Sequence, residues 1–246
     1  MTKKTLPLLF ALAICSSHVA AADLIQNGGF EADGFETYAP AGWTLHEEGA
    51  IGGSIVTSAA QSPASGYGTA GAASGSFYAL LDAFYPSQNA LIQTFVAPEL
   101  TKATLSFALF VNDQSVDGAV RISGAGLDYT TADLNRHVRV DILSANASPF
   151  ATGKEVLRTF YLGGATGRSF GDLSNAYIGF SFDVTDLLAS GGTYKLRFAN
   201  VANDAALQLG VDNVSLNVTA VPEPESWALM LAGIGMVGAI ARRRLA

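Results

Sequence analysis

Cysteine and histidine are nearly absent from this chain of 246 residues. The single cysteine, Cys15, lies in the apolar stretch near the N-terminus. The rest of the chain therefore has no disulfide, no thiolate nucleophile and no cysteine ligand for a metal. His18 lies in the same stretch, which leaves only His46 and His137, and neither belongs to a zinc or nucleophile motif. The stability of the remaining chain must come from a hydrophobic core.

Positive charge is also scarce. Between Asp23 and Val221, nineteen acidic residues stand against nine basic ones, a net formal charge of −10. Nucleic acid is not an expected partner, because its phosphates require a basic surface. An acidic surface with few charges suits an exported protein that must stay soluble.

The first 22 residues have the three parts of a secretory signal. Two lysines precede an apolar run that ends at Cys15, and small residues follow up to Ala22. We expect this signal peptide, residues 1–22, to be removed by cleavage after Ala22. The following segment, 23–220, has the length of one large domain.

Short runs of alternating apolar and polar residues, separated by turn residues, predict an all-β domain over 23–220. The predicted fold is an antiparallel β-sandwich, because each run places one face in a core and the other in water. The run 193–199, for example, predicts a solvated face made of Thr193, Lys195 and Arg197. The predicted strands are 54–57, 77–81, 91–96, 103–111, 138–143, 156–161, 176–182, 193–199 and 210–218.

Other local patterns complete the expected domain. Before the C-terminal segment, only 184–189 and 131–135 are candidates for short helices. The stretch 58–76 is built largely of alanine, glycine and serine, which predicts a long surface loop.

The last 26 residues, 221–246, have a composition of their own. Val221-Pro222-Glu223-Pro224 precedes an uncharged apolar segment, 227–241, and the basic residues Arg242, Arg243 and Arg244 follow it. A helix over 227–241 would be about 22 Å long. That is short for a bilayer core, but the arginine side chains can extend the span, so we expect a C-terminal transmembrane anchor.

The order of Pro-Glu-Pro motif, short apolar helix and basic end resembles the PEP-CTERM sorting signal of Gram-negative bacteria. This resemblance implies recognition by an exosortase in the inner membrane and cleavage near the motif. It further implies delivery of the body to the cell envelope or the extracellular matrix.

A second resemblance covers most of the body. Asn27-Gly-Gly-Phe30-Glu31, then Gly42-Trp43, and the closing run 211–216 resemble the galactose-binding-like jelly rolls found among carbohydrate-binding modules. The resemblance implies a core position for Trp43 and a structural Ca²⁺ held by Glu31 and Asp212, whose carboxylates are oxygen ligands of the kind calcium prefers. The alternative is that Glu31 caps a loop and Asp212 pairs with a lysine or arginine.

A sugar-binding site needs exposed aromatic rings flanked by polar side chains. The candidates are tyrosines in or beside predicted loops, namely Tyr38, Tyr67, Tyr85 and Tyr129. A tyrosine is also an ordinary residue at a surface, so a purely structural place for each of them stays open.

No catalytic residue is predicted, since the chain has no nucleophile, zinc or phosphate-binding motif. The neighbouring carboxylates Glu47 and Glu48, and Asp113 and Asp117, are interpreted as solvated turn residues rather than glycosidase pairs. We expect a non-catalytic envelope or matrix protein that associates with exopolysaccharide. The alternatives are a secreted polysaccharide hydrolase and an adhesive or assembly subunit that acts through protein contacts.

Overall fold

The computed structural model describes residues 21–49, 53–84, 86–115, 120–165, 169, 171–221 and 224–245. Ala21–Val221 form one compact unit, and the other unit contains helix α2 (Pro224–Leu245). The predicted signal peptide lies outside the described residues up to residue 20, whereas Ala21 and Ala22 belong to the first strand.

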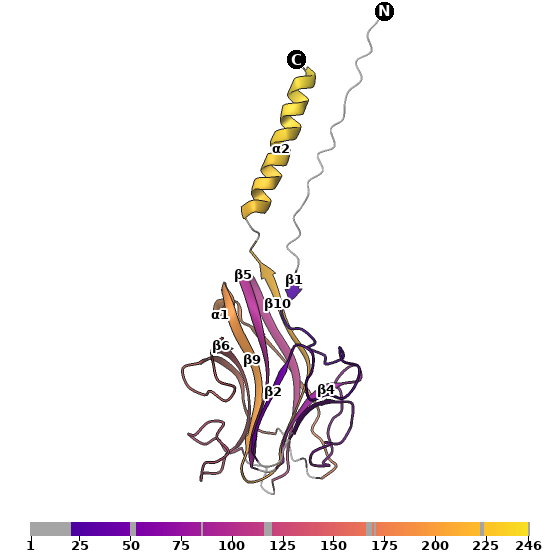
Figure 1. Cartoon of the computed structure of the whole chain (residues 1–246), viewed down its shortest axis with the longest axis vertical. Helices are drawn as coiled ribbons and strands as arrows, with labels where there is room; N and C mark the ends of the chain where they lie inside the picture. Colours follow the sequence, from indigo (N-terminus) through magenta and orange to yellow (C-terminus); the bar gives the residue numbers. More distant parts are fainter. Residues whose placement is uncertain are drawn as a thin grey trace, which may run out of the picture. The chain divides into compact units, whose positions relative to one another are not determined.

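The body is built from antiparallel strands and one short helix (Figure 1). The elements of the body are β1 (Ala21–Asp23), β2 (Thr44–Gly49), β3 (Gly53–Thr57), β4 (Tyr78–Ala83), β5 (Ser87–Asp113), β6 (Arg136–Ser144), β7 (Val156–Gly163), β8 (Ile178–Asp183), α1 (Thr185–Leu188), β9 (Ser190–Ala202) and β10 (Leu207–Ala220).

The long strand β5 belongs to both layers of the body. Its first half, Ser87 to Glu99, pairs with β2 and β9 in sheet B, which continues through β6 to β7. Its second half, Leu100 to Asp113, pairs with β10 and β8 in sheet A, which continues from β10 through β4 to β3. Strand β1 pairs with β10. The predicted antiparallel β-sandwich is confirmed.

One hydrophobic core fills the space between the two sheets. Alternate residues of β4, β5, β6, β9 and β10 point into it, as the period of two requires. Trp43 is buried, and its ring lies 5.5 Å from that of Phe30 and 6.1 Å from that of Phe198. The expected core position of Trp43 is therefore confirmed.

Two predicted elements differ in the structure. The predicted strands 91–96 and 103–111 are parts of the single strand β5, because Ala97 and Glu99 keep pairing with β9 on either side of Pro98. The segment 131–135 is not helical. Its backbone is bonded instead to Asn203, whose amide nitrogen donates to two carbonyl oxygens of the segment at 3.1 and 2.8 Å.

Two other local predictions hold. Helix α1 lies inside the predicted segment 184–189, and Asp183 Oδ1 accepts a hydrogen bond from its first N–H group, that of Thr185, at 2.9 Å. The stretch 58–76 contains no strand of either sheet. It packs on the outer face of sheet A, where Tyr78 Oη donates to Ala59 O at 2.9 Å and Asn112 Nδ2 donates to Gly68 O at 3.1 Å.

Candidate functional site

The opening and closing motifs of the body meet beside strand β10. Val214 N donates to Gly28 O at 2.9 Å, and a Cβ atom at Gly28 would lie 1.8 Å from the Val214 carbonyl oxygen. Asn213, with φ of 54°, lies in the bulge of β10 between Asp212 and Ser215. The glycine and the bulge are therefore what let the first loop approach the last strand.

Glu31 and Asp212 both accept hydrogen bonds from the loop 73–77. Glu31 uses Oε1 and Asp212 uses Oδ2 for these bonds. The donors are the backbone N–H groups of Ala73 (2.8 Å), Ser74 (3.0 Å), Ser76 (2.7 Å) and Phe77 (2.8 Å). The two carboxylates thus hold the same loop from its two ends, and both partners of the expected calcium site are brought to it.

Asp212 is buried and lies near the carboxylate of Glu31. Burial raises the pKa of Asp212, and the carboxylate of Glu31 raises it further, while N–H donors of Ser74, Asn213 and Ala73 lower it. In the described part of the chain, no group of three or more histidine, cysteine, aspartate or glutamate side chains is placed to hold a metal. The two carboxylates are oxygen ligands of the kind calcium prefers, but Glu31 Oε1 and both oxygens of Asp212 already accept backbone N–H bonds.

The candidate tyrosines have different surroundings. Tyr38 is 68 % exposed, on the loop between Glu31 and Trp43. Tyr67 is half-buried, with its ring edge-on to Phe84 at 6.0 Å between centroids. Tyr129 is half-buried against a small apolar cluster on the outer face of sheet B. Tyr85 lies outside the described residues. Of the three described rings, Tyr67 belongs to the loop on sheet A and Tyr129 to the outer face of sheet B, so these two do not form one strip.

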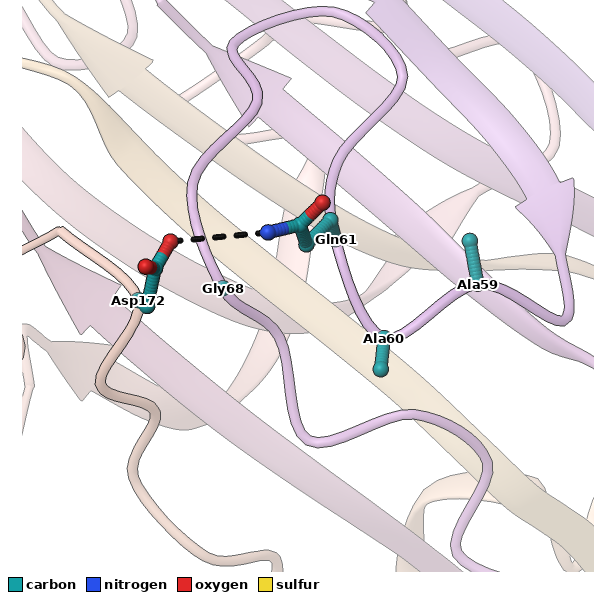
Figure 2. Close-up of a pocket in the computed structure, with 5 residues that line it drawn as sticks. All are labelled: Ala59, Ala60, Gln61, Gly68 and Asp172. Carbon is teal, nitrogen blue, oxygen red and sulfur yellow. Dashed lines mark hydrogen bonds between the residues drawn. The ribbon is translucent and has the colours of Figure 1, made fainter.

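A shallow depression of about 400 Å³ lies between the loops 59–68 and 171–172. Small residues form much of it, and Gln61 and Asp172 point toward each other across it, with Gln61 Nε2 and Asp172 Oδ1 3.5 Å apart (Figure 2). Gly68 N donates to Gly171 O at 3.0 Å, and a Cβ atom at Gly68 would lie 2.2 Å from the Asp172 carbonyl oxygen. Glycine at 68 therefore allows the two loops to meet.

A buried carboxylate lies beneath the loop 58–76 on sheet A. Asp82 Oδ2 accepts hydrogen bonds from Ser65 Oγ at 2.5 Å and from Gln208 Nε2 at 3.2 Å. Burial raises the pKa of Asp82. Sequence reasoning missed this group, although an aspartate inside the otherwise apolar run Tyr78–Ala83 is the signal that could have shown it.

The outer face of sheet B carries a buried charge cluster that corrects one prediction. Arg197, expected in solvent, is fully buried, as is its partner Asp141. Arg197 Nη1 donates to the carbonyl oxygens of Pro149 and Ala151 at 2.7 and 2.8 Å, so the loop that follows β6 covers this face. The alternation in 193–199 correctly separates two faces, and Thr193 on the second face is exposed as predicted. A loop from elsewhere in the chain removes Arg197 on the same face from contact with water.

Asp141 is held between two guanidinium groups. Arg197 Nη2 lies 2.5 Å from Asp141 Oδ2, and Arg139 donates to both carboxylate oxygens at 2.7 and 2.8 Å. Burial alone would raise the pKa of Asp141, but the two arginines outweigh it and the pKa is lowered. The buried cluster of Arg139, Asp141 and Arg197 therefore has one more positive than negative charge.

His137 lies two residues before this cluster and is also buried. Its Nδ1 is 3.0 Å from Asn135 Oδ1. Burial and the positive charges of Arg139 and Arg197 lower the pKa of His137 to about 4, against the weaker raising effects of the Arg121 backbone and Asp141. The imidazole is therefore neutral near pH 7.

The carboxylates interpreted as solvated turns are not all solvated. Asp113 is 2 % exposed, and its Oδ2 lies 3.2 Å from Nε of the buried Arg136. Asp113 is thus the buried last residue of strand β5 and not a solvated turn residue. Asp117 lies outside the described residues. Glu47 accepts from Ser54 N, and Glu48 accepts from Gln88 Nε2 at 2.8 Å. Each of these three described carboxylates thus has a hydrogen-bond or ion-pair partner within the fold.

The body ends where the Pro-Glu-Pro motif begins. Val221 N donates to Glu99 O at 3.0 Å, which is the last backbone bond to β5. Pro222 and Glu223 lie outside the described residues, and α2 covers the predicted apolar segment 227–241 and the three arginines. Within the residues described, no helix combines the length and apolar character needed to cross a bilayer.

Comparison with known proteins gives one family match and several structural similarities. No curated protein matches the sequence. Among solved structures, the Stig cyclase Fisc from Fischerella sp. TAU is 18 % identical, with 82 % of this chain and 100 % of that chain covered and a TM-score of 0.47. TmCBM61, solved with β-1,4-galactotriose, is 11 % identical over 79 % of this chain and 97 % of that chain, with a TM-score of 0.44.

A third similar structure is the K1 cleaved adhesin domain of Lys-gingipain from Porphyromonas gingivalis W83. It is 12 % identical over 82 % of this chain and 98 % of that chain, with a TM-score of 0.42. At these identities and TM-scores, the similarities transfer no activity, ligand or partner to this chain.

The family match concerns the segment after the body. The PEP-CTERM protein-sorting motif matches residues 220–244, which include the motif from Val221 to Pro224, the apolar segment and the three arginines. Such a motif marks a protein for export and for processing by a membrane exosortase. The chain is thus a β-sandwich protein that carries a PEP-CTERM sorting motif directly after its last strand.

Proposed function

We propose that this protein is a non-catalytic component of the cell envelope or extracellular matrix of a Gram-negative bacterium. In this proposal α2 holds an inner-membrane intermediate until exosortase cleavage, and the sandwich then associates with exopolysaccharide. The observation that supports the proposal most is the PEP-CTERM motif at 220–244, which begins at the last residue of β10.

The surroundings of the carboxylates favour a binding role over hydrolysis. A glycosidase needs two carboxyl groups that face each other across a cleft. The depression on the outer face of sheet A is lined by one acidic side chain, Asp172. Asp82 and Asp141 are buried in the fold, where protein groups bond to them.

Deletion of residues 242–246 tests the sorting role. The arginines fix the orientation of the apolar segment, so the truncated protein is expected to leave the envelope or matrix fraction or to keep its unprocessed mass. Cell fractionation and mass spectrometry of the body measure both effects. A matched variant with lysine at 242, 243 and 244 keeps the charge and should behave as the wild type.

The same fractions test the association with polysaccharide. Removal of the exopolysaccharide from the matrix fraction should release the wild-type protein. A truncated chain with wild-type location and mass would contradict the sorting role, and a wild-type protein that stays in the fraction after polysaccharide removal would contradict the association.

We also propose that Glu31 and Asp212 bind a structural Ca²⁺. Their approach to one loop, and the mutual repulsion of their charges, support this. An ion bound only by the folded state, with Kd near 10 µM, would add roughly 2.7 kcal/mol of stability in millimolar calcium. The expected rise in melting temperature over chelator is on the order of 5 °C.

The variant Glu31→Gln with Asp212→Asn should lose this calcium shift. The two amides keep an oxygen that accepts N–H bonds, so the shift between calcium and chelator, rather than the melting temperature itself, is the measured quantity. Magnesium at the same concentration controls for general relief of repulsion in an acidic protein. Equal shifts in both metals, or a calcium shift that persists in the variant, would exclude the site.

A further inference from the structure

Two aromatic side chains project from the loop 31–43, here called the aromatic loop. Phe35 is 63 % exposed and Tyr38 is 68 % exposed. Among the described residues of the body, 21–221, the other phenylalanine, tyrosine and tryptophan side chains are buried or half-buried. Single exposed apolar side chains are ordinary at a protein surface. Two exposed aromatic rings three residues apart, with the carboxylates of Asp33 and Glu36 beside them, are the combination of apolar and polar groups that a sugar-binding surface needs. Tyr38 is one of the predicted sugar-contacting tyrosines, whereas Phe35 is not a predicted site residue.

The aromatic loop is held in place between these two rings. Thr37 exchanges two backbone hydrogen bonds with Val56 of strand β3, at 3.0 and 2.8 Å. Glu36 Oε1 accepts a hydrogen bond from Oγ1 of Thr57, the last residue of β3, at 2.6 Å. A loop fixed by bonds on both sides of its centre loses little conformational entropy when a ligand binds its side chains.

A second anchor closes the loop. Asp33 Oδ2 accepts from the backbone N–H of Ala41 at 3.0 Å. Asp33 and Glu36 each use one carboxylate oxygen for these internal bonds, and no described residue donates a hydrogen bond to the other oxygen. The two carboxylates beside the exposed rings can therefore accept hydrogen bonds from hydroxyl groups of a ligand.

The charge of this surface limits the kind of ligand. Residues 31–43 contain three acidic side chains and no lysine or arginine. Nucleic acids, anionic membranes and acidic polysaccharides would be repelled. The aromatic area is also too small for a stable protein partner, because two rings bury about 150–250 Å² each and such interfaces bury about 800 Å² per partner. A neutral glycan, with apolar sugar faces and hydroxyl groups, matches both properties.

We infer that Phe35 and Tyr38 form the glycan-contacting surface of the body and that the glycan is uncharged. This inference rests on the proposed association with exopolysaccharide and names the surface responsible. It places binding on the aromatic loop beside β3 rather than in the depression near Gln61.

The test compares binding of exported wild-type protein and of the double variant Phe35→Ala with Tyr38→Ala. Affinity electrophoresis is run in the presence of the extracted exopolysaccharide, a neutral galactan, a neutral glucan and acidic alginate. Loss of both rings should weaken binding to the neutral glycan at least about tenfold, as expected for central aromatic contacts. Both side chains are exposed, so circular dichroism and the melting temperature should stay unchanged.

Two further variants separate ring stacking from general loss of apolar surface. The exchange Phe35→Tyr with Tyr38→Phe keeps both rings and should keep binding. The pair Val96→Ala with Leu173→Ala removes two other exposed apolar side chains, each 67 % exposed, and should also keep binding.

The outcomes distinguish the inference from the proposed function. If wild type and the double alanine variant bind equally, the aromatic loop is not the surface, while association with polysaccharide stands. Tighter binding to alginate than to the neutral glycans would overturn the uncharged ligand. If the wild type binds none of the four polysaccharides, the proposed association fails and the inference fails with it.

Discussion

Replacing Asp141 by asparagine is expected to lower the free energy of unfolding by about 3 to 5 kcal/mol, because it leaves two buried guanidinium groups without a counter-charge. Arg197 is fully buried and Arg139 is 9 % exposed, so water cannot take the place of the carboxylate. For a domain of this size the melting temperature should fall on the order of 10 °C. Chemical denaturation with an unchanged slope would show that the effect is on stability.

A solvent-exposed pair provides the matched control. Arg158 and Asp186 form a comparable two-point contact, with distances of 3.0 and 2.5 Å, but the Asp186 side chain is 72 % exposed. Asp186→Asn should leave the melting temperature nearly unchanged, since water and salt screen exposed pairs. Equal losses of stability in the two variants would contradict the assignment of the Asp141 effect to burial.

Acidification should destabilise the body through His137. The pKa of His137 is about 4 in the folded protein, against 6.5 for an ordinary histidine. Between these two values the unfolded chain binds a proton that the folded chain does not, so the free energy of unfolding falls as the pH falls from 6.5 to 4. The loss reaches roughly 3 kcal/mol at the acid end, from about 1.36 kcal/mol per pKa unit.

The variant His137→Gln isolates this contribution, because glutamine does not titrate. Denaturation curves at pH 7.5 and pH 5 should give a difference in unfolding free energy about 2 kcal/mol larger for the wild type than for the variant. His46→Gln is the control, since burial lowers the pKa of His46 as well but its side chain is only half-buried. The prediction fails if His137→Gln keeps the full dependence on pH.

The candidate sites differ in how far the sequence predicts them. The resemblance to galactose-binding-like jelly rolls pairs Glu31 with Asp212, 181 residues later, and the structure brings both to the loop 73–77. The motifs that carry this resemblance include Gly28 and Asn213, the two residues that let the first loop approach β10. The exposure of Phe35 has no such signal, because the sequence does not show which loop side chains the rest of the fold covers.

The sequence by itself determined most strands of the sandwich, the short helix near 185 and the sorting motif of the C-terminal segment, whereas β1 and β2 were not predicted. The predicted elements depend on local properties: a period of two, runs of apolar residues and clusters of charge. Each is read from residues that are neighbours in the chain. The match of the sorting motif to 220–244 confirms the resemblance of the C-terminal segment to the PEP-CTERM signal.

Only the tertiary structure decided which polar residues are buried and how the strands divide between the sheets. Arg197 is buried because carbonyl groups near Pro149 close over sheet B, and 131–135 is irregular because Asn203 bonds to its backbone. Strand β5 spans both layers because it pairs with β9 in one half and with β10 in the other. All of these contacts join residues about 50 or more positions apart, and the periodicity of a single segment carries no information about what a distant segment covers.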